Sequence, residues 1–351
     1  MTSSSAELDS LLQHYASQPD LRAGIDLEAD NLHRYAEQLC LIQLTDGDRF
    51  DLVDPLAVED LSAFGRFVEH ATIWMHGADF DMTLLRREFG VLPAMVLDTQ
   101  IAARLLGVRQ FSYANLVNQF FDVELPKGSQ KANWGQRPLP EKMLAYAVND
   151  VRYLLPLAAK LEDALREKNR YDWFIESCRA AMARIEARDG VREDPWRIQG
   201  AGKLDRKGLC YLFHLWTWRD REAAEWDRPP FMVARNKDLI TWCRELAAGR
   251  TPQLTRNIRG SRLERFRAAV EAAAQTPAEQ WPKRRKGGGR RWESEQEARY
   301  DELAKARDAA AEDLDLDPAV LAPRAVLESL VWEDAPNEDL LLPWQRELLG
   351  L

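Results

Sequence analysis

The sequence predicts an α/β domain with a mixed sheet, followed by one or two small all-α bundles. Up to about residue 190, apolar runs of strand length alternate with stretches of helical periodicity. From about 204 to 275, and again from 294 to 351, the pattern is helical throughout. With 351 residues, the chain is long enough for two or three domains, each with its own core.

The order of elements in the first part favours a mixed sheet. Strands are expected at 21–28, 38–45 and 49–53, and the turn at 46–48, Asp-Gly-Asp, is typical of a hairpin. Short connections between these three strands predict an antiparallel meander. Strand-helix-strand order farther on implies parallel neighbours. The other expected elements are strands at 72–76 and 95–97 and helices at 6–17, 57–69, 80–89, 99–107, 112–121, 140–150 and 156–188.

Breaks in the pattern divide the chain into domains. Asp189-Gly190 and Asp194-Pro195 indicate that a first domain, 1–190, ends there. A helical module at 200–280 follows, then a basic, glycine-hinged linker at 281–293. The segment 294–351 is faintly similar to the first module, which predicts a second, degenerate copy of it.

Charge and cysteine content limit the function classes. A formal net charge of -9 excludes a general attraction to polyanions, so nucleic acid would have to bind through local basic patches or metals. The four cysteines form no C-x-x-C motif, which argues against a zinc cage or a disulfide framework. The N-terminus lacks signal-peptide features, and no apolar stretch reaches the ~18 residues that span a bilayer. We therefore expect a soluble, cytoplasmic protein.

An apolar run at 21–28 ends in two carboxylates, Asp26 and Glu28. Alternate side chains of a strand point to the same face, so these two should lie side by side. Adjacent like charges repel unless a cation lies between them, and Mg²⁺ or Mn²⁺ suits oxygen ligands. Taken alone, such a pair is more often a solvated strand end.

Further carboxylates could converge on this pair. Asp79 and Asp81 open the helix after a core strand, although acidic residues in a first turn are also common as simple caps. Tyr146 and Asp150 lie four residues apart on one helix and share a face, and either alone could be merely solvated. Together, four carboxylates would suit two cations ~4 Å apart, with the tyrosine orienting an attacking water.

Three motifs carry a family resemblance: G-I-D-L-E at 24–28, H-G-A-D-F-D at 76–81 and Y-A-V-N-D at 146–150. They resemble the exonuclease motifs of the DEDD 3′-to-5′ exonuclease superfamily. Tyr146 is similar to the tyrosine branch, because the histidine branch would need histidine where this chain has Ala145. The segment 125–157 resembles the ribonuclease D family in particular. D-R-P-P-F-M-V-A-R-N-K-D-L-I at 227–240 looks like its helicase-and-RNase-D C-terminal (HRDC) domain.

The resemblance implies a ribonuclease-H-like exonuclease domain and hydrolysis of RNA from the 3′ end to nucleoside 5′-monophosphates. It implies that Tyr146 positions the water and that two divalent ions, Mg²⁺ or Mn²⁺, are held by Asp26, Glu28, Asp81 and Asp150. Asp81 is preferred to Asp79 because of the motif alignment. The implied partners are transfer-RNA precursors or other structured RNAs with a single-stranded 3′ end. A monomer without membrane contact is expected.

A polar and basic loop precedes the helix that carries Tyr146. We expect phosphate pairing and base stacking from its Lys127, Gln130, Lys131, Trp134 and Arg137. The alternative is a surface loop whose tryptophan folds onto the core. Asn133 stands where family members often have aspartate, which affects substrate preference more than chemistry. Six cations within 283–291 of the linker offer a second anchor for a polyanion.

Two other functions remain open. A DNA 3′-to-5′ exonuclease would use the same metal chemistry, and no residue is identified that reads the 2′-hydroxyl. A non-catalytic RNA-binding scaffold could keep the fold, but a degenerate copy would be expected to have lost at least one of the four carboxylates.

Overall fold

The computed structural model describes residues 1–17, 22–126, 128, 131–188, 194–284, 292–332 and 337–351. Contacts along the chain divide it into two compact units, each of which is described by itself. The first unit comprises Met1–Glu28, Leu39–Arg188 and Arg291–Leu351, and the second comprises Ala29–Gln38 and Asp189–Arg290. Within the described ranges, no helix combines the length and apolar content needed to cross a lipid bilayer.

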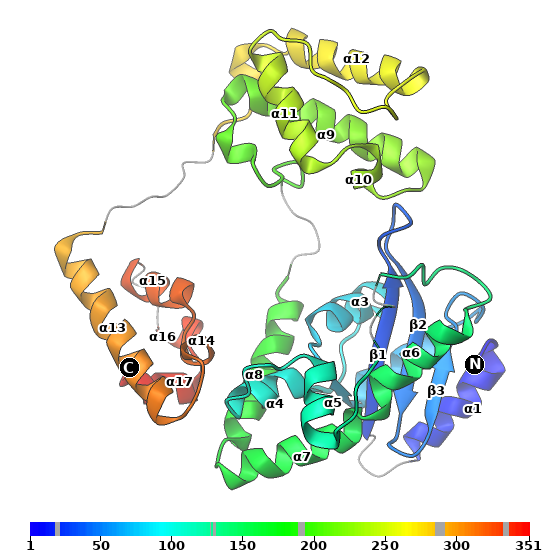
Figure 1. The fold of residues 1–351 in the computed structure, drawn as a ribbon, viewed down its shortest axis with the longest axis vertical. Coiled ribbons are helices and arrows are strands. Elements are labelled where there is room, and N and C mark those ends of the chain that lie inside the picture. The colour runs from blue at the N-terminus through cyan, green and yellow to red at the C-terminus, as the bar shows by residue number, and fades with distance from the viewer. Residues whose placement is uncertain (18–21, 127, 129–130, 189–193, 285–291, 333–336) are drawn as a thin grey trace. The chain divides into compact units, whose positions relative to one another are not determined.

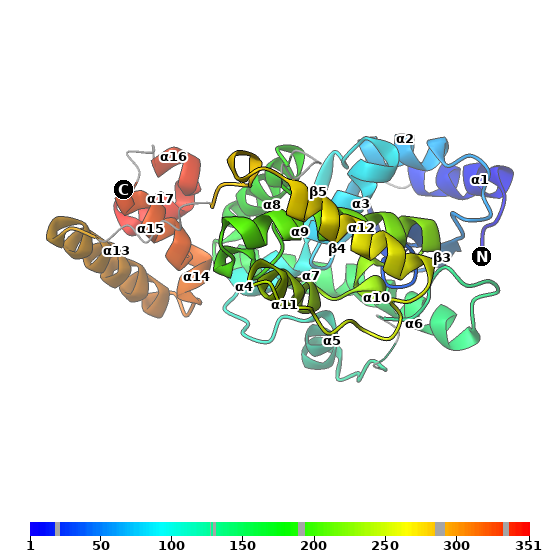
Figure 2. The ribbon, with the colours of Figure 1, turned by 90° about the horizontal axis from the view of Figure 1, so that it is seen from above.

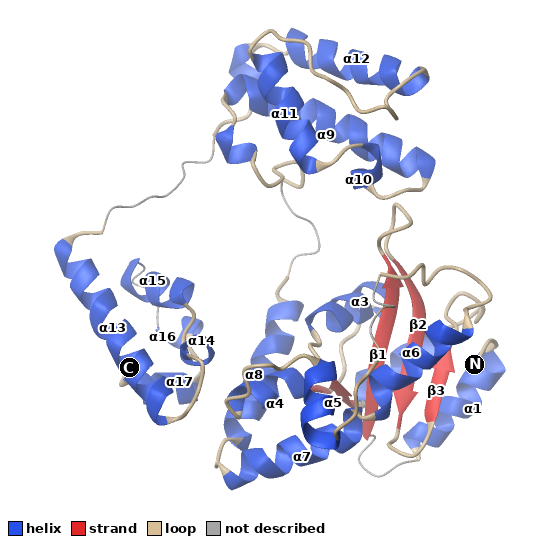
Figure 3. Cartoon of the chain, viewed as in Figure 1, coloured by secondary structure: helices blue, strands red, loops and turns tan. Residues whose placement is uncertain are grey.

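The first unit is built on a five-stranded sheet in the order β3-β2-β1-β4-β5, of which Figure 3 labels β1, β2 and β3. β2 and β3 are antiparallel, whereas β4 is parallel to both β1 and β5. The predicted mixed sheet is therefore confirmed. The strands are β1 (Arg22–Asp30), β2 (Gln38–Thr45), β3 (Phe50–Val53), β4 (Thr72–Met75) and β5 (Met95–Asp98).

Helices cover this sheet and supply its apolar partners. α1 packs along α2 (Figure 2), and α6 crosses the sheet beside β3 (Figure 1). Ile25, Leu41 and Ile73, from three adjacent strands, are fully buried. The helices are α1 (Ser5–Ala16), α2 (Ser62–His70), α3 (Asp79–Phe89), α4 (Thr99–Leu105), α5 (Tyr113–Phe121), α6 (Glu141–Arg152), α7 (Leu154–Glu167) and α8 (Tyr171–Glu186).

Two expected helices differ from the structure by more than two residues. The helix expected from residue 57 begins only at Ser62, because the Asp60 carboxylate accepts the Ser62 N–H at 2.8 Å and stabilises a turn before it. The expected helix at 156–188 is two helices, α7 and α8. Asn169 separates them with φ of 55°, a left-handed conformation that a helix cannot continue through.

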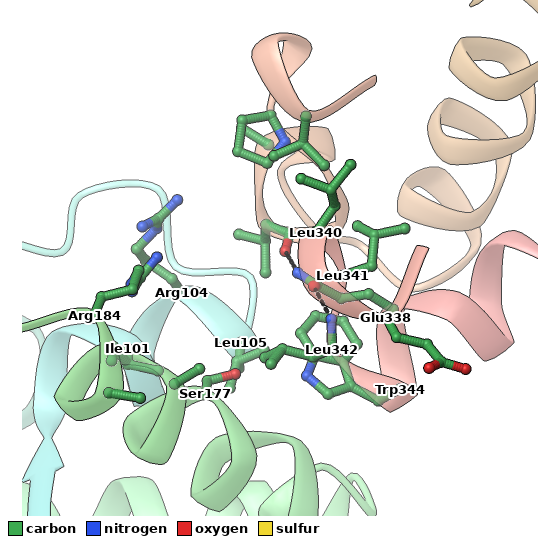
Figure 4. Close-up of a pocket in the computed structure, with 17 residues that line it drawn as sticks. Ile101, Arg104, Leu105, Ser177, Arg184, Glu338, Leu340, Leu341, Leu342 and Trp344 are labelled. Atoms are coloured by element: carbon green, nitrogen blue, oxygen red, sulfur yellow. Dashed lines mark hydrogen bonds between the residues drawn. The ribbon is translucent and has the colours of Figure 1, made fainter. Parts of the chain in front are cut away.

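The C-terminal helices of the first unit pack on α4, α7 and α8. Trp344 stacks on Trp173 with ring centroids 4.9 Å apart. The Arg170 guanidinium donates to the Leu105 carbonyl at 2.8 Å and to the Leu314 carbonyl at 2.7 Å, and so joins the two segments. Trp344 also lies beside Leu105 (Figure 4). These helices are α13 (Ser294–Asp313), α14 (Pro318–Leu321), α15 (Arg324–Trp332), α16 (Asn337–Leu340) and α17 (Pro343–Leu349).

The second unit is a helical bundle with an aromatic core. Phe266 makes edge-to-face contacts with Trp218 and Trp242, at centroid distances of 5.1 and 5.7 Å. The buried Glu222 accepts hydrogen bonds from Arg262 and Arg265 and so ties α9 to α12. Its helices are α9 (Arg206–Trp226), α10 (Pro230–Val233), α11 (Asn236–Ala247) and α12 (Ser261–Gln275).

Candidate active site

Three carboxylates from two elements converge beside the centre of the sheet. Asp26 and Glu28 lie on β1, and Asp150 lies on α6, which crosses the sheet. One oxygen from each lies within 4.8 Å of the others, and all three residues are half-buried. This spacing allows a single divalent cation to contact all three.

Asp81 approaches the same place from the first turn of α3 but lies outside this group of three. It is buried, with 6% of its surface exposed. Burial raises the pKa of the Asp81 carboxyl well above its usual value, and the charge of Asp26 raises it further. Because Asp81 also raises the pKa of Glu28, the four carboxylates interact as one electrostatic group.

Burial and mutual repulsion hold protons on this cluster. Burial raises the pKa of Asp26 to about 7. Burial, and then the charge of Asp26, raise the pKa of Asp150 to about 8, and burial followed by the charges of Asp26, Asp150 and Asp81 raises that of Glu28 to about 10. Among the described residues, no lysine or arginine forms an ion pair with these carboxylates. A divalent cation supplies the missing positive charge, so the donor set fits a metal.

Tyr146 lies one helical turn before Asp150 on α6, with its hydroxyl in hydrogen-bonding reach of that carboxylate. Burial, and then the charges of Asp150, Glu28 and Asp26, raise the pKa of the phenol above its usual value. The hydroxyl therefore keeps its proton at neutral pH and remains a hydrogen-bond donor at the edge of the acidic cluster.

Gly24 explains why β1 can lie so close to its neighbours at this point. A Cβ atom at this position would lie 2.7 Å from Thr45 Cγ2 and 3.1 Å from Leu154 Cδ2. Ile25 and Leu27 are buried on the opposite face from the acidic pair. The local sequence thus packs one face of β1 into the core and presents carboxylates on the other.

The sequence analysis did not identify two residues that support the site. The fully buried Gln43 on β2 donates its Nε2 to Asp26 Oδ2 at 3.3 Å, and a polar side chain within an apolar strand was the available signal. The Tyr113 hydroxyl accepts the Tyr153 N–H at 3.2 Å and donates to the Asn149 carbonyl at 3.4 Å. It holds the end of α6 beside Asp150, and nothing in the sequence around it marked this role.

The loop before α6 differs in part from what the sequence suggested. Trp134 is 1% exposed and packs in the core, 6.2 Å from the Tyr146 ring, so it offers no face to a base. Arg137 uses all its N–H groups on Asp54 and on the carbonyls of Trp134, Gln136 and Cys40. Both side chains therefore anchor the loop in this conformation: Trp134 agrees with the alternative of a tryptophan folded onto the core and not with base stacking, and phosphate contact by Arg137 stays a prediction. Lys131 is exposed, whereas Lys127 and Gln130 lie outside the described residues.

Comparison with known proteins gives a consistent family. Residues 1–166 match the model of a 3′-5′ exonuclease domain. The chain is 34% identical over 235 residues to ribonuclease D of Xanthomonas oryzae, and the aligned region covers 66% of this chain and 64% of that protein. It is 32% identical over 270 residues to Escherichia coli ribonuclease D, covering 74% and 71%.

A solved structure matches over nearly the whole chain. The crystal structure of Escherichia coli RNase D, described as an exoribonuclease involved in structured RNA processing, superposes with a TM-score of 0.74 at 26% identity. The match covers 100% of this chain and 98% of that one. The helical segments after the exonuclease domain are therefore part of the shared architecture.

Proposed function

Because the chain belongs to the ribonuclease D family, we propose that it shortens RNA from the 3′ end by metal-dependent hydrolysis of phosphodiester bonds. The observation that carries this proposal is the meeting of Asp26, Glu28 and Asp150 within 4.8 Å. Chance acidic clusters are common, but this one is half-buried, lacks a described cationic partner and lies beside a protonated tyrosine.

Each residue of the site has a distinct role in this proposal. Asp26, Glu28, Asp81 and Asp150 hold two divalent cations, Mg²⁺ or Mn²⁺. When bound, these ions polarise the attacking water and offset the charge that develops on the phosphodiester. The Tyr146 hydroxyl donates its proton to the Asp150 carboxylate, which holds it in place, and its oxygen would accept a hydrogen bond from the attacking water and so orient it. The product is a nucleoside 5′-monophosphate.

The substrate proposed is a transfer-RNA precursor or another structured RNA with a single-stranded 3′ end. The stated role of the Escherichia coli enzyme in structured RNA processing supports this choice. The exposed Lys131, just before α6, and the basic linker 281–293 are the proposed sites of phosphate contact. The enzyme is proposed to act as a cytoplasmic monomer, which suits its four free cysteines.

We assign the helical segments 200–280 and 294–351 to two HRDC-like modules that follow the exonuclease domain, 1–190. Their helices begin at corresponding positions and share one hydrogen bond, from an arginine of the long helix to a backbone carbonyl, which supports common ancestry. Nucleic-acid binding by these modules would help to hold a structured RNA while its end is shortened.

Site variants test the proposal. Asp26→Asn and Asp150→Asn should each lower Mg²⁺-dependent release of nucleotides from 5′-labelled RNA by roughly a thousandfold or more, because each removes a cation ligand worth several kcal/mol. Tyr146→Phe should slow release by about 100-fold through misplacement of the water. Asp163→Asn, which changes an exposed carboxylate on α7, is the matched control and should leave the rate unchanged.

The same assay separates the alternatives. A matched DNA strand should be degraded more slowly than RNA, and faster loss of DNA would make the chain a DNA exonuclease. If the purified protein bound RNA but released no nucleotides with Mg²⁺ or Mn²⁺, it would be a scaffold. Release of nucleoside 3′-monophosphates would contradict the proposed direction of water attack.

A further inference from the structure

Asp98, the last residue of β5, makes three hydrogen bonds to two other parts of the chain. Its Oδ1 accepts the Gly77 N–H at 2.8 Å and the Gln100 N–H at 2.7 Å. Its Oδ2 accepts the Ala78 N–H at 2.9 Å. The side chain is buried, with 7% of its surface exposed. One carboxylate therefore caps α4 and also binds the turn that leads from β4 into α3.

This turn is the part of the chain that places Asp81. Ala78 is the N-cap residue of α3, and no side chain of its own helix caps it. Gly77 has φ of 68°, a left-handed conformation that suits glycine. A Cβ atom at Gly77 would lie 3.2 Å from Gln100 Nε2, so the turn packs closely on the start of α4. The free N–H groups before α3 are thus satisfied by a residue from a different strand.

Thr99 adds a second tie between the same two segments. It is fully buried, and its hydroxyl donates to the Met75 carbonyl at 3.1 Å. The same hydroxyl lies 2.9 Å from His76 Nδ1. Residues 75–78 connect β4 to α3, and hydrogen bonds from Asp98 and Thr99, at the end of β5, therefore fix the whole connection. Because Asp81 lies in the first turn of α3, its position depends on this passage.

We propose that Asp98 is a positioning residue for the metal ligand Asp81: its carboxylate fixes residues 77 and 78 so that Asp81 reaches the cation held by the other three carboxylates. This inference rests on the proposed function. Among the described residues, the hydrogen bonds of the Asp98 carboxylate come from backbone N–H groups, so Asp98 would act on a bound ion through Asp81. Partners of this kind orient metal ligands, and their loss typically weakens metal binding or activity about 10- to 100-fold.

Asp98→Asn is the most informative variant. Asparagine keeps an oxygen for Gly77 and Gln100 but turns an NH₂ group toward the Ala78 N–H, so only one anchor is lost. Mn²⁺ binding, measured by titration calorimetry, should weaken about 10- to 100-fold. In the nuclease assay, kcat should fall, KM for RNA should stay constant, and excess Mn²⁺ should restore part of the rate.

A matched control separates positioning from simple helix capping. Asp317 is an N-cap aspartate of α14 that accepts the Ala319 N–H at 2.9 Å. Asp317→Asn should lower the melting temperature slightly and leave Mn²⁺ affinity unchanged. If Asp98→Asn also lowered only the melting temperature, with normal Mn²⁺ affinity and kcat, Asp98 would be a structural cap and the proposal would be overturned.

A double-mutant cycle tests whether Asp98 acts through Asp81. In an Asp81→Asn background, Asp98→Asn should change Mn²⁺ affinity less than twofold, because the ligand that it positions is already gone. An undiminished effect would mean that the Asp98 charge acts directly on the ion, against the proposal. If Asp81→Asn alone left Mn²⁺ binding and hydrolysis intact, the assignment of the active site would fail, independently of the role of Asp98.

Discussion

The two helical modules follow the same path through different cores. Corresponding helices begin 88 residues apart: α9 at Arg206 and α13 at Ser294, α10 at Pro230 and α14 at Pro318, α11 at Asn236 and α15 at Arg324. The turn after each long helix contains an aspartate with positive φ, 48° at Asp227 and 51° at Asp315. The same local devices therefore guide the chain in both modules.

One hydrogen bond also recurs at this spacing. Arg219 on α9 donates to the Ala234 carbonyl at 3.1 Å, and Arg307 on α13 donates to the Ala322 carbonyl at 3.3 Å. Each arginine ties the long helix to the residue that ends the short helix. Because the bond satisfies a carbonyl that the short helix leaves free, it stabilises this path in both modules.

The apolar residues differ, and with them the surface that each module buries. In the second unit, Trp218 and Trp242 close the bundle on Phe266 of α12. The corresponding residues of the C-terminal module are Ala306 and Leu330. That module instead buries Ala311, Leu316, Leu321 and Trp344 against the exonuclease domain. The C-terminal module also has a small core of its own, formed by Leu303, Leu327 and Leu341 among others. The difference teaches that turn residues set the path of such a module, whereas the size of its apolar side chains decides how much of its core it completes alone and how much on a neighbour.

Removing one tryptophan from each module should have the largest effect. Trp344→Ala should cost about 3–5 kcal/mol, because a buried aromatic side chain is replaced by a cavity. Hydrogen exchange should rise in residues 294–351 and also in α4, α7 and α8, since Trp344 packs against these helices. Trp242→Ala should cost a similar amount, but its faster exchange should be confined to residues 195–281. If Trp242→Ala also raised hydrogen exchange well outside its own module, the distinction between the two modules would be lost.

The comparison also shows what a sequence can predict about a fold. Strand alternation and helical periodicity were enough to find the mixed sheet, and β2 was placed at its observed bounds, Gln38–Thr45. The pattern gave no warning of the break at Asn169, because apolar spacing continues across it. Nor could the apolar pattern show which surface the C-terminal helices cover, since an apolar stripe on a helix does not identify the surface against which it packs.

The active site, like the fold, has some features that the sequence reveals and others that only the structure shows. Carboxylates in short motifs are visible in a sequence because charge within apolar surroundings is unusual, and this led to Asp26, Glu28 and Asp150. Burial cannot be read directly from the sequence, so base stacking by Trp134 and its packing in the core both stayed open until the structure showed it buried. Contacts between distant strands, such as that from Gln43 to Asp26, depend on the sheet order and could be found only in the structure.

Without divalent metal, a change of pH should affect the stability of the two units differently. The size of this effect should lie between those of the tryptophan variants above and the arginine variants below. Asp26 and Asp150 have folded pKa values of about 7 and 8, whereas unfolded aspartates titrate near 4. The folded first unit therefore holds protons that the unfolded chain has released, and its stability falls as pH rises from 6 to 8. The slope is about 1.4 kcal/mol per pH unit for each such proton. Calorimetry in EDTA should show this loss of stability in the unfolding transition of the first unit, which is identified as the transition that Trp344→Ala shifts.

The second unit is the internal control for this experiment. Hydrogen bonds from Arg265 lower the pKa of Glu222, so that carboxylate stays ionised between pH 6 and 8. Burial lowers the pKa of His214, which therefore stays neutral. The transition that Trp242→Ala shifts should therefore not fall over this range; it should rise slightly between pH 6 and 7, because only the unfolded chain protonates His214 there. Saturating Mn²⁺ should abolish the trend in the first unit, because metal-bound carboxylates hold no protons and those of the unfolded chain have already lost theirs above pH 6. Parallel slopes in both units would contradict the assigned pKa shifts.

Replacing the recurrent arginine in each module should have the smallest effect and the sharpest contrast. Arg219 is 5% exposed and donates to the buried Ala234 carbonyl and to the side chain of the exposed Asn236, so Arg219→Met leaves one buried acceptor unpaired and removes a second hydrogen bond. The expected loss of unfolding free energy is about 1–3 kcal/mol. Arg307→Met frees the Ala322 carbonyl and removes a hydrogen-bonded ion pair with the exposed Asp308, and should cost about 1 kcal/mol. Urea denaturation measures both, with the exposed Arg244→Met as a control that should change little. If both arginine variants lost the same free energy, the two modules would depend equally on this bond, and only their apolar cores would distinguish them.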